Sequence, residues 1–277
     1  MNKKVIFLDI DGTFTEPGCN DAPESAVRAV EEARRNGHYV FLCTGRNYDM
    51  LKPVLQYDFD GVIASAGGYV VYRNEVIFDC PMTPEQQEKV LTVLEKNGIF
   101  RTVECKDGSF TDDSFKEFLK ANAGENGNSE FLRWREQIEK SLNIRSMKEY
   151  DGRPVYKVVI MASDEAMLEE PKRVLEEEFL FSIQDKDQRG IINGELINRR
   201  FDKGQAVVRV CEHLGIPVED SIGFGDSVND REMLEVCGVS VCMANGSESM
   251  KAIADYVCPA VTEDGLAAAF RKYHLTD

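Results

Sequence analysis

A buried strand that ends in two carboxylates constrains the fold of this chain more than any other feature. The run Val5-Ile6-Phe7-Leu8 is short and wholly apolar, which predicts a strand covered on both faces. Asp9 and Asp11 follow at its C-terminal end. Side chains alternate along a strand, so the two carboxylates can point the same way only if the chain turns between them, and Gly12 gives the backbone that freedom. One carboxylate can then attack an electrophile while the other transfers a proton.

Strand and helix patterns alternate over the first and last parts of the chain. Strands are predicted at residues 5–8, 39–43, 61–64, 221–224, 239–243 and 256–258, a hairpin at 69–72 and 76–78, and helices at 23–36, 51–57, 203–214 and from about 263 onward. This alternation is typical of a mostly parallel sheet with helices on both faces. In such sheets, ligands bind beyond the C-terminal ends of the strands.

The middle of the chain has a different pattern of predicted elements. Between about residue 81 and residue 186 we expect helices at 84–97, 131–141 and 165–178, a strand at 155–161, and a charged, loop-rich stretch through residues 124–128. The chemical motifs all lie in the flanking segments.

Three further motifs belong to those flanking segments. Thr44-Gly45-Arg46 follows the second strand, Lys203 begins a helix after the possible N-cap Asp202, and Gly225-Asp226-Ser227-Val228-Asn229-Asp230 follows a later strand. Each motif alone also fits an ordinary turn, a solvated helix residue or a helix cap. The functional interpretation depends on all four motifs occurring in order, three of them at strand ends.

These residue types match the needs of phosphoryl transfer from a monoester: a nucleophile, a proton donor for the leaving group, and positive charge around the phosphoryl oxygens. Asp9 is the predicted nucleophile, which would form an aspartyl phosphate, and Asp11 is the predicted proton donor and acceptor. Mg²⁺ prefers oxygen ligands, which Asp9, the backbone carbonyl of Asp11, and Asp226 would supply. The phosphoryl oxygens would be contacted by Thr44, Lys203 and the backbone N–H groups of Gly12 and Thr13.

The net charge of −16 restricts the partners of the protein. Negative charge of this size argues against nucleic acid and anionic membranes as partners. It would also repel a phosphorylated substrate at long range. Capture of such a substrate therefore needs Mg²⁺ and a few fixed cations close to the site.

Cysteine usage and hydropathy indicate the compartment. The eight cysteines are scattered without a CxxC pair, which argues against a zinc site or a disulfide framework and favours free thiols in a reducing compartment. No apolar run approaches the ~20 residues that span a bilayer, and the N-terminal segment is too short for a signal peptide. We therefore expect a cytoplasmic protein.

The combination of motifs resembles the haloacid dehalogenase (HAD) superfamily of phosphatases, and within it the Cof-like branch. The stretch from Val5 to Thr13 is similar to the first motif of the family, Phe41 to Arg46 to the second, and residues 225–230 to the fourth. Asp202-Lys203-Gly204 is similar to the third, although family members more often carry Ser before the Lys. Aspartate at position 11 separates the chain from the transporter ATPases of the superfamily, which carry Thr there.

The resemblance implies a fold and a set of site residues. The fold is α/β, with a Rossmann-like parallel-sheet core formed by residues 1–80 and 187–277 and an inserted α/β cap domain formed by residues 81–186. Caps of this kind close over the site and contribute substrate contacts. The implied catalytic residues are Asp9 and Asp11; the implied phosphate-binding residues are Gly12, Thr13, Thr44, Gly45, Arg46, Lys203 and Asn229; and the implied Mg²⁺-binding residues are Asp9, Asp11, Asp226 and Asp230.

One turn departs from the pattern of the branch. Relatives usually have an Asn-Gly-Ala turn facing the cap after the third strand, whereas this chain has Ala66-Gly67-Gly68. Because the amide side chain is missing, we expect a substrate contact that relatives make here to be absent. The substrates of relatives are therefore a weaker guide to the substrate of this chain.

We expect a Mg²⁺-dependent phosphatase that acts on small phosphorylated metabolites, sugar phosphates first, as a monomer or weak homodimer. A phosphomutase that returns the phosphoryl group to a sugar is the alternative within the superfamily. A signalling module that accepts phosphate on Asp9 is an alternative from another class, but receiver domains of that kind are much shorter and lack a large inserted cap. A dinucleotide-binding protein is disfavoured because no GxGxxG follows the first strand.

Overall fold

The computed structural model describes residues 3–114, 144–183 and 191–277, and it divides into two compact units. The first unit comprises Met1–Arg46, Leu51–Asp79 and Asp202–Asp277, and the second comprises Asn47–Met50 and Cys80–Phe201. The predicted helix at 131–141 and the predicted loop-rich stretch at 124–128 lie outside the described residues.

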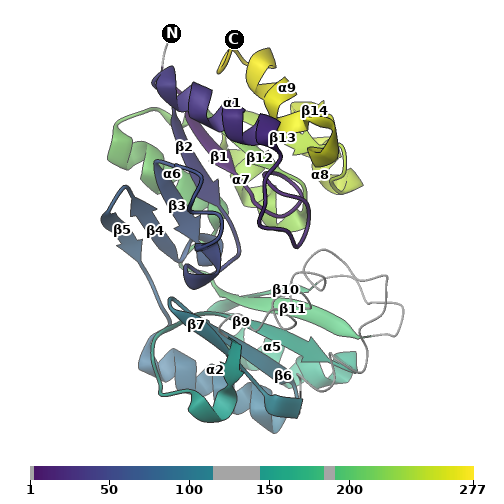
Figure 1. Cartoon of the computed structure of the whole chain (residues 1–277). Helices are drawn as coiled ribbons and strands as arrows, with labels where there is room; N and C mark the ends of the chain where they lie inside the picture. Colours follow the sequence, from purple (N-terminus) through teal and green to yellow (C-terminus); the bar gives the residue numbers. More distant parts are fainter. Residues whose placement is uncertain (1–2, 115–143, 184–190) are drawn as a thin grey trace. The chain divides into compact units, whose positions relative to one another are not determined.

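An eight-stranded sheet forms the first unit, in the order β14-β13-β12-β1-β2-β3-β4-β5 (Figure 1). Its strands are β1 (Val5–Leu8), β2 (Tyr39–Cys43), β3 (Gly61–Ala64), β4 (Tyr69–Tyr72), β5 (Glu75–Asp79), β12 (Ser221–Gly225), β13 (Val239–Met243) and β14 (Tyr256–Cys258). The strands from β14 to β3 pair in parallel, and β4 and β5 add an antiparallel hairpin at one edge. Every residue of β1 and β3 is buried, which explains their continuous apolar sequences. The predicted α/β class is confirmed.

Helices lie on both sides of this sheet (Figure 1). They are α1 (Glu24–Arg35), α6 (Lys203–Leu214), α7 (Arg231–Val236), α8 (Glu248–Ile253) and α9 (Gly265–Lys272). Buried side chains of α6, α7 and α8 join those of β1 and β2 in one apolar core, and α1 and α9 contact each other. The helix α6 starts where Asp202 accepts a hydrogen bond from the N–H of Gln205, and it ends at Gly215, which has a φ of 66°.

A six-stranded sheet forms the second unit, in the order β10-β11-β9-β6-β7-β8. Its strands are β6 (Phe100–Cys105), β7 (Gly108–Thr111), β8 (Ile144–Ser146), β9 (Val155–Ala162), β10 (Phe179–Ile183) and β11 (Ile192–Asn198). Only β7 and β8 pair in parallel among the described neighbours. The helices α2 (Pro84–Lys96) and α5 (Glu169–Leu175) share an apolar core with this sheet. A capping box between Thr83 and Gln86, with Pro84 in the first turn, starts α2.

Short 3-10 turns complete both units. They are η1 (Asp49–Leu51), η2 (Ser65–Gly67), η3 (Met147–Glu149), η4 (Glu165–Leu168), η5 (Val218–Asp220), η6 (Val228–Asp230) and η7 (Val261–Glu263). The predicted helix at 51–57 is wrong, since only η1 and irregular turns occur there. The predicted helix at 165–178 is shorter than expected and is divided into η4 and α5. Within residues 3–114, 144–183 and 191–277, no helix has the length and apolar character needed to cross a bilayer.

The second unit comprises other residues than the predicted cap. We placed the end of the cap at residue 186, but β11 pairs with both β9 and β10, so the unit continues to Phe201. The segment Asn47–Met50 also belongs to it, because Nδ2 of Asn47 donates to Oγ of Ser109 at 2.9 Å. Strand pairing and side-chain contacts far apart in the sequence therefore set these limits.

Most strands of the second unit were not predicted from the sequence. Of its sheet, only β9 was predicted. In β6, for example, Arg101 and Glu104 break the apolar pattern, although both side chains are buried. Arg101 lies against α2, where its Nη1 donates to the carbonyl of Leu91 at 2.9 Å. A charged residue whose partner comes from another element makes a buried strand look like a loop.

A buried lysine lies between two buried glutamates in the same sheet. Lys157 of β9 is paired with Glu104 of β6, with 3.4 Å between Nζ and Oε2, and it also donates to the carboxylate of Glu195 in β11. The exposed fraction is 0% for the side chains of Lys157 and Glu104 and 5% for that of Glu195. Charges buried to this extent are tolerated when they are paired, so these contacts stabilise the alignment of three central strands.

We predict that Lys157→Ala destabilises the second unit strongly. The change leaves two buried glutamates without the ammonium group between them, and the loss of one member of a buried ion pair costs about 3–5 kcal/mol. The measurement is the free energy of unfolding from denaturant titration. Lys96→Ala is the matched control, because Lys96 pairs with Glu170 with 66% of its own side chain exposed, and it should cost less than about 1 kcal/mol. Equal losses in the two variants would contradict a stabilising role for the buried cluster.

Candidate active site

Three of the predicted site residues meet because the strands before them are neighbours. β12, β1 and β2 lie side by side and parallel, so the residues that follow these strands emerge at one edge of the sheet. They are Asp226, Asp9 and Thr44. The N–H of Asp9 donates to the carbonyl of Phe224 at 3.0 Å, which continues the pairing of β1 with β12 up to the site.

The turn after Asp11 depends on a glycine, as the sequence predicted. Gly12 has a φ of +87°, and a Cβ atom on it would lie 2.5 Å from Oδ2 of Asp226. Its carbonyl accepts a hydrogen bond from Nδ2 of Asn245 at 2.8 Å, and Oδ1 of Asn245 accepts from the N–H of Val261 at 2.9 Å. Gly12 therefore serves both the backbone conformation and the close approach of Asp226.

Lys203 joins two of the carboxylates. Its Nζ lies 2.7 Å from Oδ1 of Asp9 and 2.6 Å from Oδ1 of Asp230, and its side chain is buried. Burial alone would lower the pKa of Lys203, but the charges of Asp230 and Asp9 raise it well above its usual range. The lysine is therefore a fixed cation. Asp202 places it there by capping α6, so that the side chain of the first helical residue reaches the strand edge.

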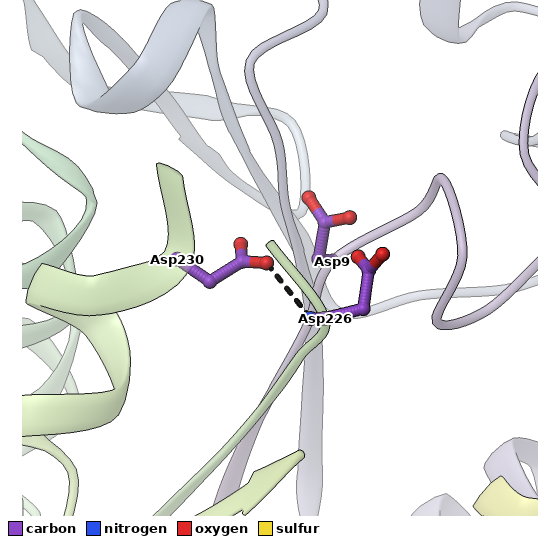
Figure 2. A group of neighbouring side chains, drawn as sticks. All are labelled: Asp9, Asp226 and Asp230. Atoms are coloured by element: carbon purple, nitrogen blue, oxygen red, sulfur yellow. Dashed lines mark hydrogen bonds between the residues drawn. The ribbon is translucent and has the colours of Figure 1, made fainter. Parts of the chain in front are cut away.

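Asp230 connects the lysine to the backbone of the fourth motif. Its Oδ1 accepts from Lys203, and its Oδ2 accepts from the N–H groups of Asp226 at 3.0 Å and Ser227 at 3.1 Å. Figure 2 shows the contact with the backbone of Asp226 as a dashed line. Because both oxygens are engaged by donors of the protein, Asp230 is better placed to orient Asp226 and Lys203 than to bind a cation directly.

The acidic cluster fits a divalent cation. Figure 2 shows the carboxylates of Asp9 and Asp226 side by side, and ligand oxygens of Asp9, Asp226 and Asp230 all lie within 4.8 Å of one another. Oδ1 of Asp226 is buried and accepts no hydrogen bond from a described residue. Three carboxylates with one lysine leave a formal excess of two negative charges, which one Mg²⁺ ion would balance.

The pKa shifts of two carboxyls have the same origin. Burial, together with the charge of Asp230, raises the pKa of Asp9 to about 7, against the opposing effect of Lys203. Burial and the charges of Asp230 and Asp9 raise the pKa of Asp226 to about 9. Ionised carboxylates are thus unfavourable at this edge in the absence of a cation.

Three hydroxyl groups near the first two motifs differ in their hydrogen bonds. Oγ1 of Thr44 accepts the N–H of Arg46 at 3.1 Å, which leaves its proton available to a ligand oxygen. Oγ1 of Thr13 and Oγ of Ser65 are buried and bond to no described residue. Buried hydroxyls without protein partners are uncommon, and such groups can donate to an oxyanion.

Asn229 and Gly45 complete the predicted phosphate-binding set. Asn229 is half-buried, and its Oδ1 accepts from Oγ of Ser227 at 2.8 Å. Gly45 is buried beside Thr44. Their phosphate contacts, like those of Gly12, Thr13, Thr44 and Lys203, remain predictions.

Arg46 contacts the carboxylate of Asp11. Its guanidinium donates to both oxygens of Asp11, at 2.9 and 2.7 Å, and its phosphate contact stays a prediction. It also donates to Oδ1 of Asn20 at 2.7 Å and to the carbonyl of Cys19 at 3.2 Å. The arginine is therefore bound to the predicted proton donor.

Three site residues were missed by the sequence analysis as contributors: Asn20, Ser65 and Asn245. Asn20 lies in a loop and Ser65 begins η2, and neither belongs to a recognisable motif, so no sequence feature could have identified them. The bond of Asn245 to Gly12 is a tertiary contact, which no local sequence pattern reveals.

We predict that Gly12→Ala abolishes Mg²⁺ binding while the protein still folds. The new Cβ would occupy the space of the Asp226 carboxylate. The measurement is the rise in melting temperature on addition of Mg²⁺, which should disappear. Gly215→Ala is the matched control. Gly215 also has a positive φ, of +66°, but no atom of the described residues lies within 4 Å of the place that a Cβ would take, so this variant carries the backbone cost of about 1 kcal/mol without a clash. A full Mg²⁺ effect in Gly12→Ala would disprove the placement of the ion.

We also predict that Mg²⁺ stabilises the protein more at pH 8 than at pH 6. Near pH 6 both Asp9 and Asp226 hold protons, because their pKa values are about 7 and about 9, and a cation must displace them. The apparent affinity should therefore rise with pH, roughly tenfold per unit for each proton released. Melting temperatures at increasing Mg²⁺ test this, with Asp226→Asn as the variant that should show no Mg²⁺ effect. If the rise in melting temperature had its midpoint at the same Mg²⁺ concentration at both pH values, the prediction would be refuted.

Comparisons with known proteins agree with this geometry. The family model of haloacid dehalogenase-like hydrolases matches residues 6–270. Among curated relatives, "Putative phosphatase YkrA" of Bacillus subtilis is 28% identical over 99% of both chains, and "Phosphatase YwpJ" of the same organism is 27% identical over 95% of this chain and 97% of its own. A solved structure of a hypothetical protein from Geobacillus kaustophilus matches with a TM-score of 0.79 and 25% identity over 99% of this chain and 100% of its own.

The fold is shared with a solved phosphatase of one subclass. The HAD subclass IIB sugar phosphatase BT4131 matches with a TM-score of 0.76 and 24% identity, over 99% of this chain and 100% of its own. Family model, curated relatives and fold therefore agree over nearly the whole chain. The chain belongs to the haloacid dehalogenase-like hydrolases, in the Cof-like branch, and it is a phosphatase.

Proposed function

We propose that this phosphatase hydrolyses small phosphorylated metabolites, sugar phosphates first, in a Mg²⁺-dependent reaction that passes through an aspartyl phosphate on Asp9. The observation that carries the proposal is the environment of Asp9. Its carboxylate is buried, is bonded to Lys203, and lies beside the carboxylate of Asp226, in which one buried oxygen accepts no hydrogen bond from a described residue.

Asp9 would act as the nucleophile. One carboxylate oxygen is held by Lys203, which leaves the other oxygen to attack phosphorus. As the bond between this oxygen and phosphorus forms, the bond from phosphorus to the leaving oxygen of the substrate breaks. A buried carboxylate with few competing water molecules is a stronger nucleophile than a solvated one.

Asp11 would move the proton in both half-reactions. It gives a proton to the leaving oxygen, so that the alcohol departs neutral. It then takes a proton from the water that attacks phosphorus, and the Asp9 carboxylate is released as inorganic phosphate forms. The net change is one ester and one water converted to one alcohol and one phosphate.

Fixed donors would hold the phosphoryl oxygens. Lys203 supplies charge, and Thr44 and Thr13 supply hydroxyl groups. Mg²⁺, held by Asp9 and Asp226 with the backbone carbonyl of Asp11, would neutralise the charge on the transferring group. These local charges oppose the net charge of −16, which repels an anionic substrate.

The proposed substrate class follows from the relatives. Curated relatives from Methanobrevibacter smithii and Methanosarcina mazei are named phosphoglycolate phosphatases, and YitU of Bacillus subtilis is named as a phosphatase of 5-amino-6-(5-phospho-D-ribitylamino)uracil. All of these substrates, like those of a sugar phosphatase, are small phosphorylated metabolites. We place sugar phosphates first because BT4131 shares the fold.

We predict that Asp9→Asn lowers kcat on every substrate by roughly 10³-fold or more, since the amide cannot form the aspartyl phosphate. Phosphate release should be measured with Mg²⁺ on hexose, pentose and polyol phosphates, phosphoglycolate, pyridoxal phosphate and flavin mononucleotide. Asp58→Asn is the control, because Asp58 is exposed. Substantial turnover by Asp9→Asn would refute the nucleophile. Formation of an isomeric hexose phosphate in place of free phosphate would identify a mutase.

A further inference from the structure

We infer that Asn20 is a positioning residue for proton transfer: it holds Arg46, which in turn holds the carboxylate of Asp11. This inference rests on the proposed function of Asp11 as the proton donor and acceptor. It assigns Asn20 and Arg46 a role in the chemistry of the leaving group.

The contact between Arg46 and Asp11 is a two-point contact. Nε of Arg46 lies 2.9 Å from Oδ2 of Asp11, and Nη2 lies 2.7 Å from Oδ1. Two parallel N–H···O bonds fix the plane of a carboxylate as well as its distance. The N–H of Gly18 adds a third bond to Oδ1 of Asp11, at 3.1 Å.

Asn20 holds the opposite side of the guanidinium. Its Oδ1 accepts from Nη1 of Arg46 at 2.7 Å, and the carbonyl of Cys19 accepts from Nη2 at 3.2 Å. The side chain of Arg46 is 2% exposed. The loop after the first motif therefore bonds to both groups: Cys19 and Asn20 accept from Arg46, and Gly18 donates to Asp11.

The backbone of Arg46 is fixed too. Its N–H donates to Oγ1 of Thr44 at 3.1 Å, and its carbonyl accepts from the N–H of Ser65 at 2.8 Å. With the backbone fixed, Oδ1 of Asn20 holds Nη1, whereas Asp11 and the carbonyl of Cys19 accept from Nε and Nη2. Loss of the Asn20 acceptor would let the plane turn, and the carboxylate of Asp11 would turn with it.

This geometry predicts an effect on one class of substrate. An alkyl phosphate, such as a sugar phosphate, must receive a proton on its leaving oxygen as the bond to phosphorus breaks. p-Nitrophenyl phosphate releases a stable phenolate that needs no proton. A misplaced Asp11 should therefore slow hydrolysis of alkyl phosphates selectively. A damaged fold or a lost phosphate contact would slow both substrates alike.

The experiment compares kcat and KM of Asn20→Ala on the best alkyl phosphate of the metabolite panel and on p-nitrophenyl phosphate, with Mg²⁺ in excess. We expect the ratio of kcat on the alkyl to that on the aryl substrate to fall about 10- to 100-fold, with little change in KM. Asn20→Asp keeps an oxygen acceptor at the same place and should restore most of the ratio. Arg46→Lys loses the two-point contact and should lower the ratio at least as much as Asn20→Ala.

Asn36→Ala is the matched control. Asn36 is also part-buried in the first unit, but its Nδ2 donates to the carbonyl of Leu275 at 2.9 Å and it lies at the end of α1. The ratio should be unchanged in this variant. Melting temperatures of all variants show whether they fold.

Three results would overturn the inference. They are an equal loss of kcat on both substrates, a rise in KM with kcat unchanged, and an unchanged ratio in Asn20→Ala. Failure of the proposed function has a different signature. In that case the unmodified protein hydrolyses neither substrate in an Asp9-dependent way, and the positioning role of Asn20 is refuted as well.

Discussion

The burial of negative charge at one edge of the first sheet is the constraint on which the rest of the site depends. Three parallel strands bring Asp9, Thr44 and Asp226 to this edge, and Lys203 of α6 enters the cluster. Burial raises the free energy of each ionised carboxylate, and hydrogen bonds from nearby donors offset this cost. Lys203 joins Asp9 to Asp230, and Asp230 in turn accepts the backbone N–H groups of Asp226 and Ser227. The cluster keeps a formal excess of negative charge, which a divalent cation would balance.

The same arrangement separates the carboxyls of Asp9 and Asp11. Asp9 belongs to the buried cluster, whereas Asp11 lies beyond the turn and pairs with Arg46. Two acids two residues apart thus have different partners and can take different roles, one as nucleophile and one as carrier of the proton. Gly12 makes this separation possible because its backbone turns without a side chain that would displace Asp226. Asn245 then fixes the turn from the C-terminal part of the chain.

Much of the first unit could be predicted because its local patterns agree with its tertiary structure. β2, β3, β13, β14 and α6 occur at the predicted residues. Their sequences are apolar runs or capped amphipathic stretches, in which local preference and burial favour the same conformation. The second unit was predicted poorly for the opposite reason. In β6, the charged residues Arg101 and Glu104 are buried against partners from α2 and β9, which no local pattern reveals. The end of the unit at Phe201, beyond the expected residue 186, likewise depends on the pairing of β11 with β9.

By itself, the sequence determined the α/β class, the order of the four motifs and the identity of the carboxylates and lysine, because strand-end positions in a parallel sheet converge whatever the details of packing. Only the tertiary structure decided which partner each charged group has. Arg46 follows a strand as predicted, yet its guanidinium contacts Asp11, Asn20 and Cys19. Hydrogen bonds of a long, flexible side chain depend on atoms from distant segments within about 3 Å of its nitrogen atoms, and such distances are set when the chain folds.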